Sequence, residues 1–168
     1  NQGLISANAP GSGLSIGGSF TNQGTVEAIN AGTLAIGATS WVNSGTVRIG
    51  VGSTMTLRGM INAGGTILNQ GGTLTFQGLT QNNGATLTID APTGSTRLQG
   101  GIQGGTILVT PGSLVDTYTS FSPANLSGVS LHGNLRVPNQ PGAGLVLQNG
   151  VTLNGTIQLL GGEVRFMN

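Results

Sequence analysis

The chain has 168 residues, of which 32 are glycine and none is cysteine. Charged residues make up 5% of the chain, the formal net charge is +1, and 36% of the residues are hydrophobic. Disordered chains usually combine low hydrophobicity with high net charge, so this composition argues against disorder. The few ionisable groups leave little for acid–base or metal chemistry, and the five dispersed arginines form no basic patch. We therefore expect no catalytic residues, cofactor, metal or nucleic-acid partner.

No apolar run reaches the ~18 residues that a membrane helix requires, so we expect no membrane insertion. The absence of cysteine excludes disulfides and thiolate metal sites, but it does not decide the compartment. The sequence begins at Asn1 and ends inside an apolar pattern, GGEVRFMN. We therefore expect this chain to be a segment of a longer protein.

Along the chain, the first predicted strand of each unit recurs at a nearly constant spacing. The segments NQGLISA, NQGTVEA, NSGTVRI, AGGTILN, NGATLTI and QGGTILV align in one register. One column of the alignment begins with Leu4 and continues as an evenly spaced series of threonines: Thr25, Thr46, Thr66, Thr86 and Thr106. Just upstream of each member lies a column rich in asparagine: Asn1, Asn22, Asn43, Ala63, Asn83 and Gln103. A fixed period of about 20 residues is typical of stacked repeats.

A second strand is predicted after each of the first. The segments GLSIGG, GTLAIG, STMTLRG, GTLTFQG and, less clearly, STRLQGG alternate apolar residues with small or polar ones. This period of two is the signature of a half-buried strand. Because the apolar residues keep the same side in every unit, each unit offers one face to a common core.

The last third of the chain keeps the pattern with different residues. GVSLHGNLRV, which starts at Gly128, matches GVTLNGTIQL, which starts at Gly150, one period later. The interval from Gly105 to Gly133 is longer than one period, so one unit carries roughly six to eight extra residues. We place these extra residues at 116–123 and predict an irregular insertion at about 111–127.

Units this short cannot enclose a core alone, but stacked units can, because each strand pairs with its copy one coil away. We predict one all-β domain over 1–168, a right-handed parallel β-helix (β-solenoid) of about eight coils of 20–22 residues. Glycine suits the corners of such coils. Stacked side-chain amides predict a hydrogen-bonded ladder along one corner, made of Asn1, Asn22, Asn43, Asn83 and Gln103.

The alternation of N-x-G-T-[VI] with G-T-L-x-[IF], together with the phrase GVTLNGTIQL, resembles the repeats of large secreted bacterial surface proteins. These are the filamentous-haemagglutinin-like adhesins and the autotransporter passenger domains. The resemblance covers nearly all of the chain except about 111–127. It implies a right-handed parallel β-helix, export across the cell envelope, and a structural or adhesive role. It carries over no catalytic residues.

The predicted insertion is the candidate recognition loop, because loops on a rigid scaffold often carry recognition. It contains Asp116, Tyr118 and Phe121. The alternative is an ordinary bulged corner packed against the rod. Outside the insertion, we expect Phe20 to stack on Trp41, which occupies the same place in the next unit, or to cover an end of the core with it.

The leading functional hypothesis is a non-enzymatic structural or adhesion module, a stalk, passenger or filament subunit that is secreted or displayed on the bacterial surface. Such a module would associate end to end with itself or continue into further coils of the same chain, since an open strand edge pairs readily. A host-surface or glycan ligand is compatible with this role.

Two alternatives stay open at the level of sequence. One is a polysaccharide-binding or polysaccharide-degrading β-helix, for which Asp90 and Asp116 are the candidate carboxylates in the regular middle of the chain. The other is a flat surface that binds ice or glycan, suggested by the pairs Thr54/Thr56, Thr73/Thr75 and Thr86/Thr88. The irregular order of polar residues beside the threonine column weakens the second alternative.

Overall fold

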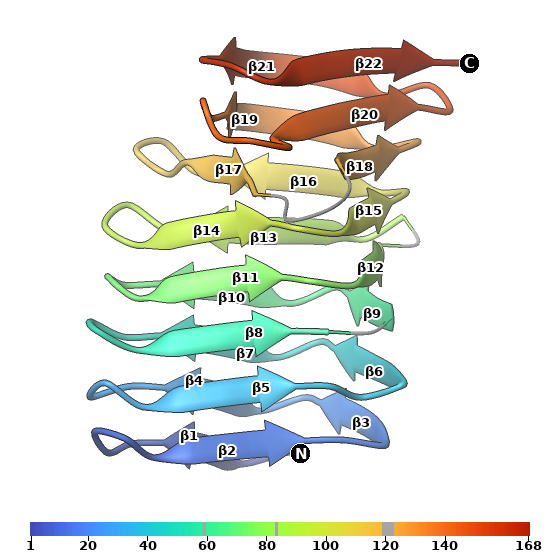
Figure 1. The fold of residues 1–168 in the computed structure, drawn as a ribbon. Helices are drawn as coiled ribbons and strands as arrows, with labels where there is room; N and C mark the ends of the chain where they lie inside the picture. The colour runs from blue at the N-terminus through green and yellow to red at the C-terminus, as the bar shows by residue number, and fades with distance from the viewer. Residues whose placement is uncertain (59, 83, 119–122) are drawn as a thin grey trace.

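The computed structural model describes residues 1–58, 60–82, 84–118 and 123–168, and all the regular structure in them is β-strand. The strands form three columns (Figure 1). The first column holds β1 (Leu4–Ala7), β4 (Thr25–Ala28), β7 (Thr46–Ile49), β10 (Thr66–Asn69), β13 (Thr86–Asp90) and β16 (Thr106–Val109). The second column holds β2 (Gly13–Ile16), β5 (Thr33–Ile36), β8 (Thr54–Leu57), β11 (Thr73–Phe76), β14 (Ser95–Leu98) and β17 (Val115–Thr117).

The third column runs the whole length of the molecule. It holds β3 (Ser19–Asn22), β6 (Ser40–Asn43), β9 (Met60–Ala63), β12 (Leu79–Gln81), β15 (Gly101–Gln103), β18 (Ala124–Ser127), β20 (Gly144–Gln148) and β22 (Glu163–Met167). The two remaining strands, β19 (Ser130–Val137) and β21 (Thr152–Leu159), are twice as long as most others. Strand β19 spans the first and second columns together, because it pairs with both β16 and β17, and β21 pairs with β19 along its whole length.

Every strand pairs in parallel with the equivalent strand one turn away, giving a 14-stranded and an 8-stranded sheet. In Figure 1 the nearer strands run from left to right while the chain rises toward the C-terminus, which is the geometry of a right-handed coil. The predicted right-handed β-solenoid is therefore confirmed. The eight strands of the third column are joined by about seven turns, slightly fewer than the eight predicted.

The pairing register confirms much of the sequence alignment and corrects one part of it. Thr25 pairs with Thr46, and the strand from Ser130 to Val137 pairs with the strand from Thr152 to Leu159 in the predicted register. Thr66, however, pairs with Thr88 and not with Thr86. The predicted threonine column is thus broken between β10 and β13. A shift of two positions leaves the same side chains facing out, so hydrophobic alternation cannot distinguish these two registers.

The predicted insertion is also shorter than expected. The ladder continues through β17 and β18, both of which lie within 111–127. The extra length lies between Thr117 and Ala124, because the step from Gly101 to its partner Asn125 is longer than the step from Val115 to its partner Leu135. Within 116–123, therefore, Asp116, Thr117 and Tyr118 belong to the regular turn or follow it directly.

The core is one continuous apolar cluster along the axis of the solenoid, formed by the inward-facing residues of all three columns. Burial of each large aliphatic side chain contributes about 1.5–3 kcal/mol, so repetition over the turns supplies the main stabilising term. Phe20 and Trp41 are paired neighbours on β3 and β6, and their ring centroids lie 6.4 Å apart, as the sequence predicts. No helix in the described part of the chain is long and apolar enough to cross a membrane.

Candidate functional site

An asparagine ladder runs along the corner before the first strand of each early turn. Asn1 Nδ2 donates to Asn22 Oδ1 at 2.8 Å, and Asn22 Nδ2 donates to Asn43 Oδ1 at 2.8 Å. The amide of Asn22 also donates to the backbone oxygen of Thr46 at 3.2 Å. Asn22 is completely buried, so these bonds satisfy polar groups that water cannot reach. The ladder thus ties successive corners together.

The later predicted members of the ladder require correction. Asn83 lies outside the described residues, and its neighbour Asn82 occupies the equivalent place. Asn82 Nδ2 donates to the backbone oxygen of Thr106, the same relation along the chain as between Asn22 and Thr46. Gln103 is exposed on β15 and pairs with Gln81, one position away from the asparagine column. Side chains alternate along a strand, so an offset of one position turns Gln103 outward.

Glycines beside this ladder allow the corners to pack in direct backbone contact. A Cβ atom on Gly45 would overlap the backbone oxygen of Gly24, and one on Gly65 would overlap the backbone oxygen of Gly45. Gly45 has no positive φ angle, so close approach rather than backbone conformation requires glycine here.

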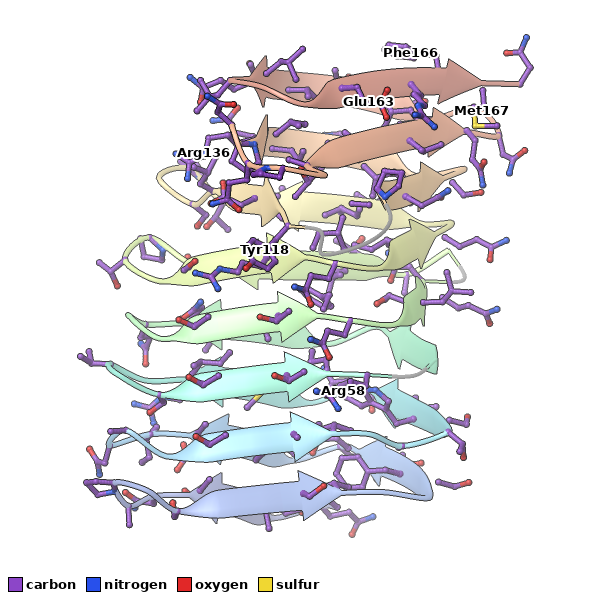
Figure 2. The ribbon with its side chains drawn as sticks, viewed as in Figure 1. Arg58, Tyr118, Arg136, Glu163, Phe166 and Met167 are labelled. Atoms are coloured by element: carbon purple, nitrogen blue, oxygen red, sulfur yellow. The ribbon has the colours of Figure 1, made fainter. Side chains whose placement is uncertain are left out.

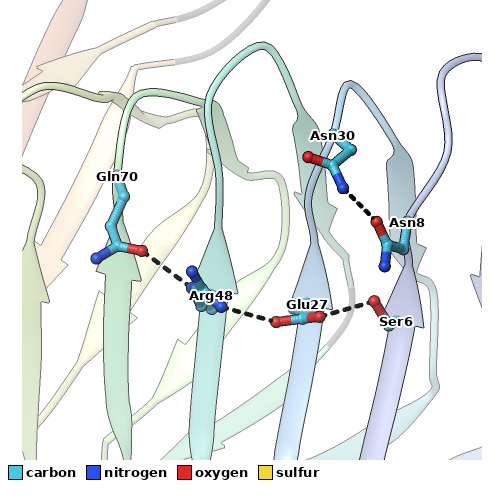
Figure 3. Close-up of polar contacts among 6 residues, drawn as sticks. All are labelled: Ser6, Asn8, Glu27, Asn30, Arg48 and Gln70. Atoms are coloured by element: carbon cyan, nitrogen blue, oxygen red, sulfur yellow. Dashed lines mark hydrogen bonds and ion pairs between the residues drawn. The ribbon is translucent and has the colours of Figure 1, made fainter.

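Polar side chains form further ladders along the outward-facing sides of the strands, where Glu27 is covered by its neighbours. Ser6 Oγ donates to Glu27 Oε1 at 2.8 Å, while Arg48 donates from Nη1 to Glu27 Oε2 at 3.3 Å and from Nε to Gln70 Oε1 at 2.9 Å (Figure 3). Asn30 donates to Asn8 one turn away at 2.5 Å. A similar line joins Arg58 to Gln77 and Gln77 to Gln99. Each bond links neighbouring turns, so the ladders reinforce the stack.

The sequence-predicted residue Asp116 lies on β17 with its side chain directed outward. Arg136, its paired neighbour on β19, donates Nε and Nη2 to the two Asp116 carboxylate oxygens, each at 2.7 Å. The hydrogen bond with Asp116 raises the pKa of Arg136 above its ordinary value. Burial opposes this rise, and the carboxylate's charge adds a smaller increase. The bidentate geometry holds both side chains in a fixed position.

Tyr118 follows β17 directly, two residues after Asp116. The Arg97 guanidinium carbon is 5.0 Å from the centroid of the Tyr118 ring, a cation–π contact. Arg97 also pairs in register with Asp116, so three consecutive turns contribute Arg97, Asp116 and Arg136 to one outward row. The third predicted loop residue, Phe121, lies outside the described residues.

Next to this row, the outer face of β19 and β21 has a shallow hollow of about 230 Å³. Its lining consists of Leu114, Asn134, Leu135, Thr156 and Gln158. All of these side chains are neutral, so the hollow offers hydrogen-bonding groups but no acid or base of its own.

The two candidate carboxylates for polysaccharide cleavage are not brought together. Asp90 ends β13 and accepts a hydrogen bond from Thr110 Oγ1 at 2.9 Å, whereas Asp116 lies on β17 in the second strand column. Figure 1 shows these columns on opposite sides of the rod. Among the residues that the structure describes, no three His, Asp or Glu side chains form a group that could hold a metal ion.

The sequence pattern locates these clusters along the chain, but it does not reveal which residues contact one another within them. The repeat pattern does not single out Arg97, Arg136 or Asn82, although each pairs with or stands in for a predicted residue. Paired residues on neighbouring turns are separated by about one repeat. Comparing outward positions at that spacing from Asp116 therefore identifies Arg97 and Arg136.

The C-terminal end of the solenoid is open. Among the residues that the structure describes, β21 pairs only with β19 and β22 only with β20. Their apolar side chains are exposed, including Leu153, Leu159, Phe166 and Met167. A hollow of about 210 Å³ lies between the two strands and is lined in part by Val151, Leu153 and Phe166.

The fold and these surfaces define a right-handed parallel β-solenoid with polar outer faces. The chain matches no family model, and neither a curated protein nor a solved structure is significantly similar to it.

Proposed function

We propose that the chain is a non-enzymatic structural and adhesion module, a stalk, passenger or filament subunit of a bacterial surface protein that is secreted or displayed on the cell. The observation that carries this proposal is the unbroken parallel ladder, in which one core and three strand columns repeat over about seven turns. Such a rod is extended along its axis and resists bending. The repeat motifs that resemble filamentous-haemagglutinin-like adhesins support the same role.

The surface chemistry also favours this role. The few charged side chains are mostly engaged with neighbours one turn away, as in the Arg48–Glu27 and Arg136–Asp116 ion pairs. The outer rows are otherwise rich in Thr, Ser, Asn and Gln. Uncharged hydrogen-bonding rows suit contact with glycans or host surfaces more than they suit acid–base chemistry. The hollow beside Asn134 offers such a ligand neutral hydrogen-bonding side chains.

A polysaccharide-degrading function is the second candidate, and Asp116 is the residue that would have to carry it. Cleavage of a glycosidic bond needs two carboxyl groups about 5–10 Å apart. Asp116 instead has both oxygens bound by Arg136, and Asp90 lies in another strand column. This arrangement does not fit the two-carboxylate mechanism of hydrolysis.

Surface display tests the proposal directly. The chain is anchored on a non-adherent bacterium, and attachment to cultured host cells and to immobilised glycans is measured. We expect attachment to rise, to be lost with Gly45→Ala, which disrupts the stack, and to survive Gly37→Ala, a glycine with open space around it. Unchanged attachment would contradict the adhesive role. Release of reducing ends from a polysaccharide panel, abolished by Asp116→Asn, would establish the enzymatic alternative.

A further inference from the structure

The fold brings three of the five arginines to one face, the outward side of the second strand column. Arg58 directly follows β8, Arg97 lies on β14, and Arg136 lies on the part of β19 that pairs with β17. Figure 2 shows Arg58 and Arg136 at different heights along this face. Of the four acidic residues, all of which the structure describes, Asp116 alone lies in this column. Because Arg136 binds both oxygens of Asp116, Arg58 and Arg97 are the two charges here that no acid neutralises.

Neutral neighbours hold both of these guanidinium groups. Arg58 Nε donates to Gln77 Oε1 at 2.6 Å, and Gln77 Nε2 donates to Gln99 Oε1 at 2.8 Å. The Arg97 guanidinium lies against the Tyr118 ring, and no other side chain in the described ranges binds it. A guanidinium carries five N–H donors in a planar fork that matches a carboxylate. Both arginines therefore keep donors that a carboxylate of a ligand could use.

Two turns of the solenoid separate these arginines. Strand β8 pairs with β11, which pairs with β14. Neighbouring parallel strands lie about 4.8 Å apart, so the two positions lie about 10 Å apart along the axis. Thr56, not Arg58, is in register with Arg97, so Arg58 is also offset by about 7 Å along its strand. The side chain of Arg58 is exposed and long enough to span much of that offset.

This spacing fits the chemistry of one class of ligand. An extended chain of β-linked sugars advances by about one strand spacing per sugar. In a glycan that alternates a uronate with a neutral sugar, the carboxylates recur on every second sugar. Their separation is therefore close to the axial distance between Arg58 and Arg97, and the neutral sugar between them would face the exposed amide of Gln77.

We propose that this face binds a linear acidic glycan that lies along the axis of the solenoid, with Arg58 and Arg97 each binding a carboxylate two sugars apart. The inference rests on the proposed adhesive role and names the class of ligand. Tyr118 positions Arg97 by packing against its guanidinium. The site lies on the side of the middle turns, β8 to β14, so additional turns at either end of the rod would not cover it (Figure 1).

Calorimetry of the full chain with hyaluronan oligosaccharides, in which every second sugar is a uronate, tests the proposal. We expect binding, and a loss of about tenfold in affinity with Arg97→Gln, because a hydrogen bond to a charged group is removed. Arg48→Gln is the matched control, since it removes the same charge from the first strand column. Equal affinities of the two variants, or equal binding of neutral chitin oligosaccharides by the natural chain, would overturn the proposal.

A charge-preserving exchange tests the spacing. Arg58→Gln/Gln77→Arg keeps the net charge and the order of arginine and glutamine neighbours, but it places two arginines on adjacent turns. We expect weaker hyaluronan binding by this variant and no change in its weak binding to single-stranded DNA, which serves as a general polyanion. Hyaluronan affinity unaffected by the exchange, or DNA bound by the natural chain as tightly as hyaluronan, would overturn the proposal, because either result indicates a general response to negative charge.

The outcomes also separate this inference from the adhesive role. If the anchored chain attaches to host cells but the chain does not bind hyaluronan, the acidic-glycan site is wrong and the adhesive role stands. If the chain binds hyaluronan with the expected dependence on Arg97 but the anchored chain attaches to no host cell or immobilised glycan surface, the adhesive role is wrong and the site stands.

Discussion

The early and late turns of this solenoid solve the same problem, how to turn the chain through a corner, in two different ways. In the early turns the first and second columns are separate strands, and at the corner between them Asn30 donates a hydrogen bond to Asn8 one turn away. In the last two turns β19 and β21 run through both columns as single strands of 8 residues each. Corner side chains therefore stabilise the first region, and continuous backbone pairing stabilises the second.

Glycine is needed in both regions, but for different neighbours. Gly45 packs against the corner of the preceding turn, whereas Gly133 bends β19 with a φ of 113° and Gly155 stacks directly on it. The comparison shows that close approach between turns is common to both kinds of corner. An asparagine also links the late turns, because Asn149 Nδ2 donates to Ser127 Oγ at 2.8 Å.

The largest expected loss of stability comes from a substitution at Gly45. Gly45→Ala places a Cβ atom against the backbone oxygen of Gly24, so the two turns must separate, at a cost near the upper end of about 1–3 kcal/mol. Gly37→Ala is the matched control, since nothing lies within 4 Å of the added carbon. Urea unfolding should show a much lower midpoint for Gly45→Ala and little change for Gly37→Ala. Equal midpoints would mean that the corners have room to relax.

The corresponding change in the late turns is Gly155→Ala, which places a Cβ atom against the backbone of Gly133. In the described part of the chain the last turn pairs only with the turn before it, so we expect it to separate locally while the earlier turns stay folded. Hydrogen exchange should therefore accelerate in β19, β21 and β22 and remain slow in β4 to β8. Acceleration along the whole chain would show that the two regions unfold as one unit.

The ladder itself is expected to contribute less than the glycines. Asn22→Ala removes a buried amide and leaves Asn43 Oδ1 and the Thr46 backbone oxygen without their donor, which costs about 1–3 kcal/mol. Gln103→Ala is the comparison, because that side chain is exposed and should change stability by less than about 0.5 kcal/mol. Thermal unfolding measures both. Similar losses for the two variants would restore Gln103 to the ladder.

How far the sequence predicts these features depends on whether a feature repeats. Period-two alternation predicts the fold because it recurs in every unit. The residue-by-residue match between the last two units predicts the pairing of β19 with β21. The position of Asn82 and the pairing of Thr66 with Thr88 are local departures. These departures shift the alignment by one or two residues. The geometry of the corners decides shifts of that size, and a sequence alignment does not record that geometry.

The candidate site follows the same rule. Asp116 and Tyr118 could be singled out as unusual residues in a chain with little charge, but their roles depend on Arg136 and Arg97. These arginines become neighbours only once the register of β14, β17 and β19 is known. The regular pairing of Asp116, which lies within the predicted insertion, is likewise hidden because the sequence pattern weakens where the step between β15 and β18 lengthens.

The smallest predicted effect lies at the boundary between the two regions, where Asp116 on β17 meets Arg136 on the first long strand. Asp116→Asn removes the ion pair, and since both side chains are partly solvated we expect a loss of up to about 1 kcal/mol. The raised pKa of Arg136 means that its contribution is fully present below its ordinary pKa and disappears only as the pH rises through the higher, folded-state value. The difference in unfolding free energy between natural chain and variant should therefore not change through Arg136 between neutral and moderately alkaline pH. Added salt should reduce it, because exposed charges are screened. A difference that grows with salt would show that Asp116 acts through packing at this boundary and not through its charge.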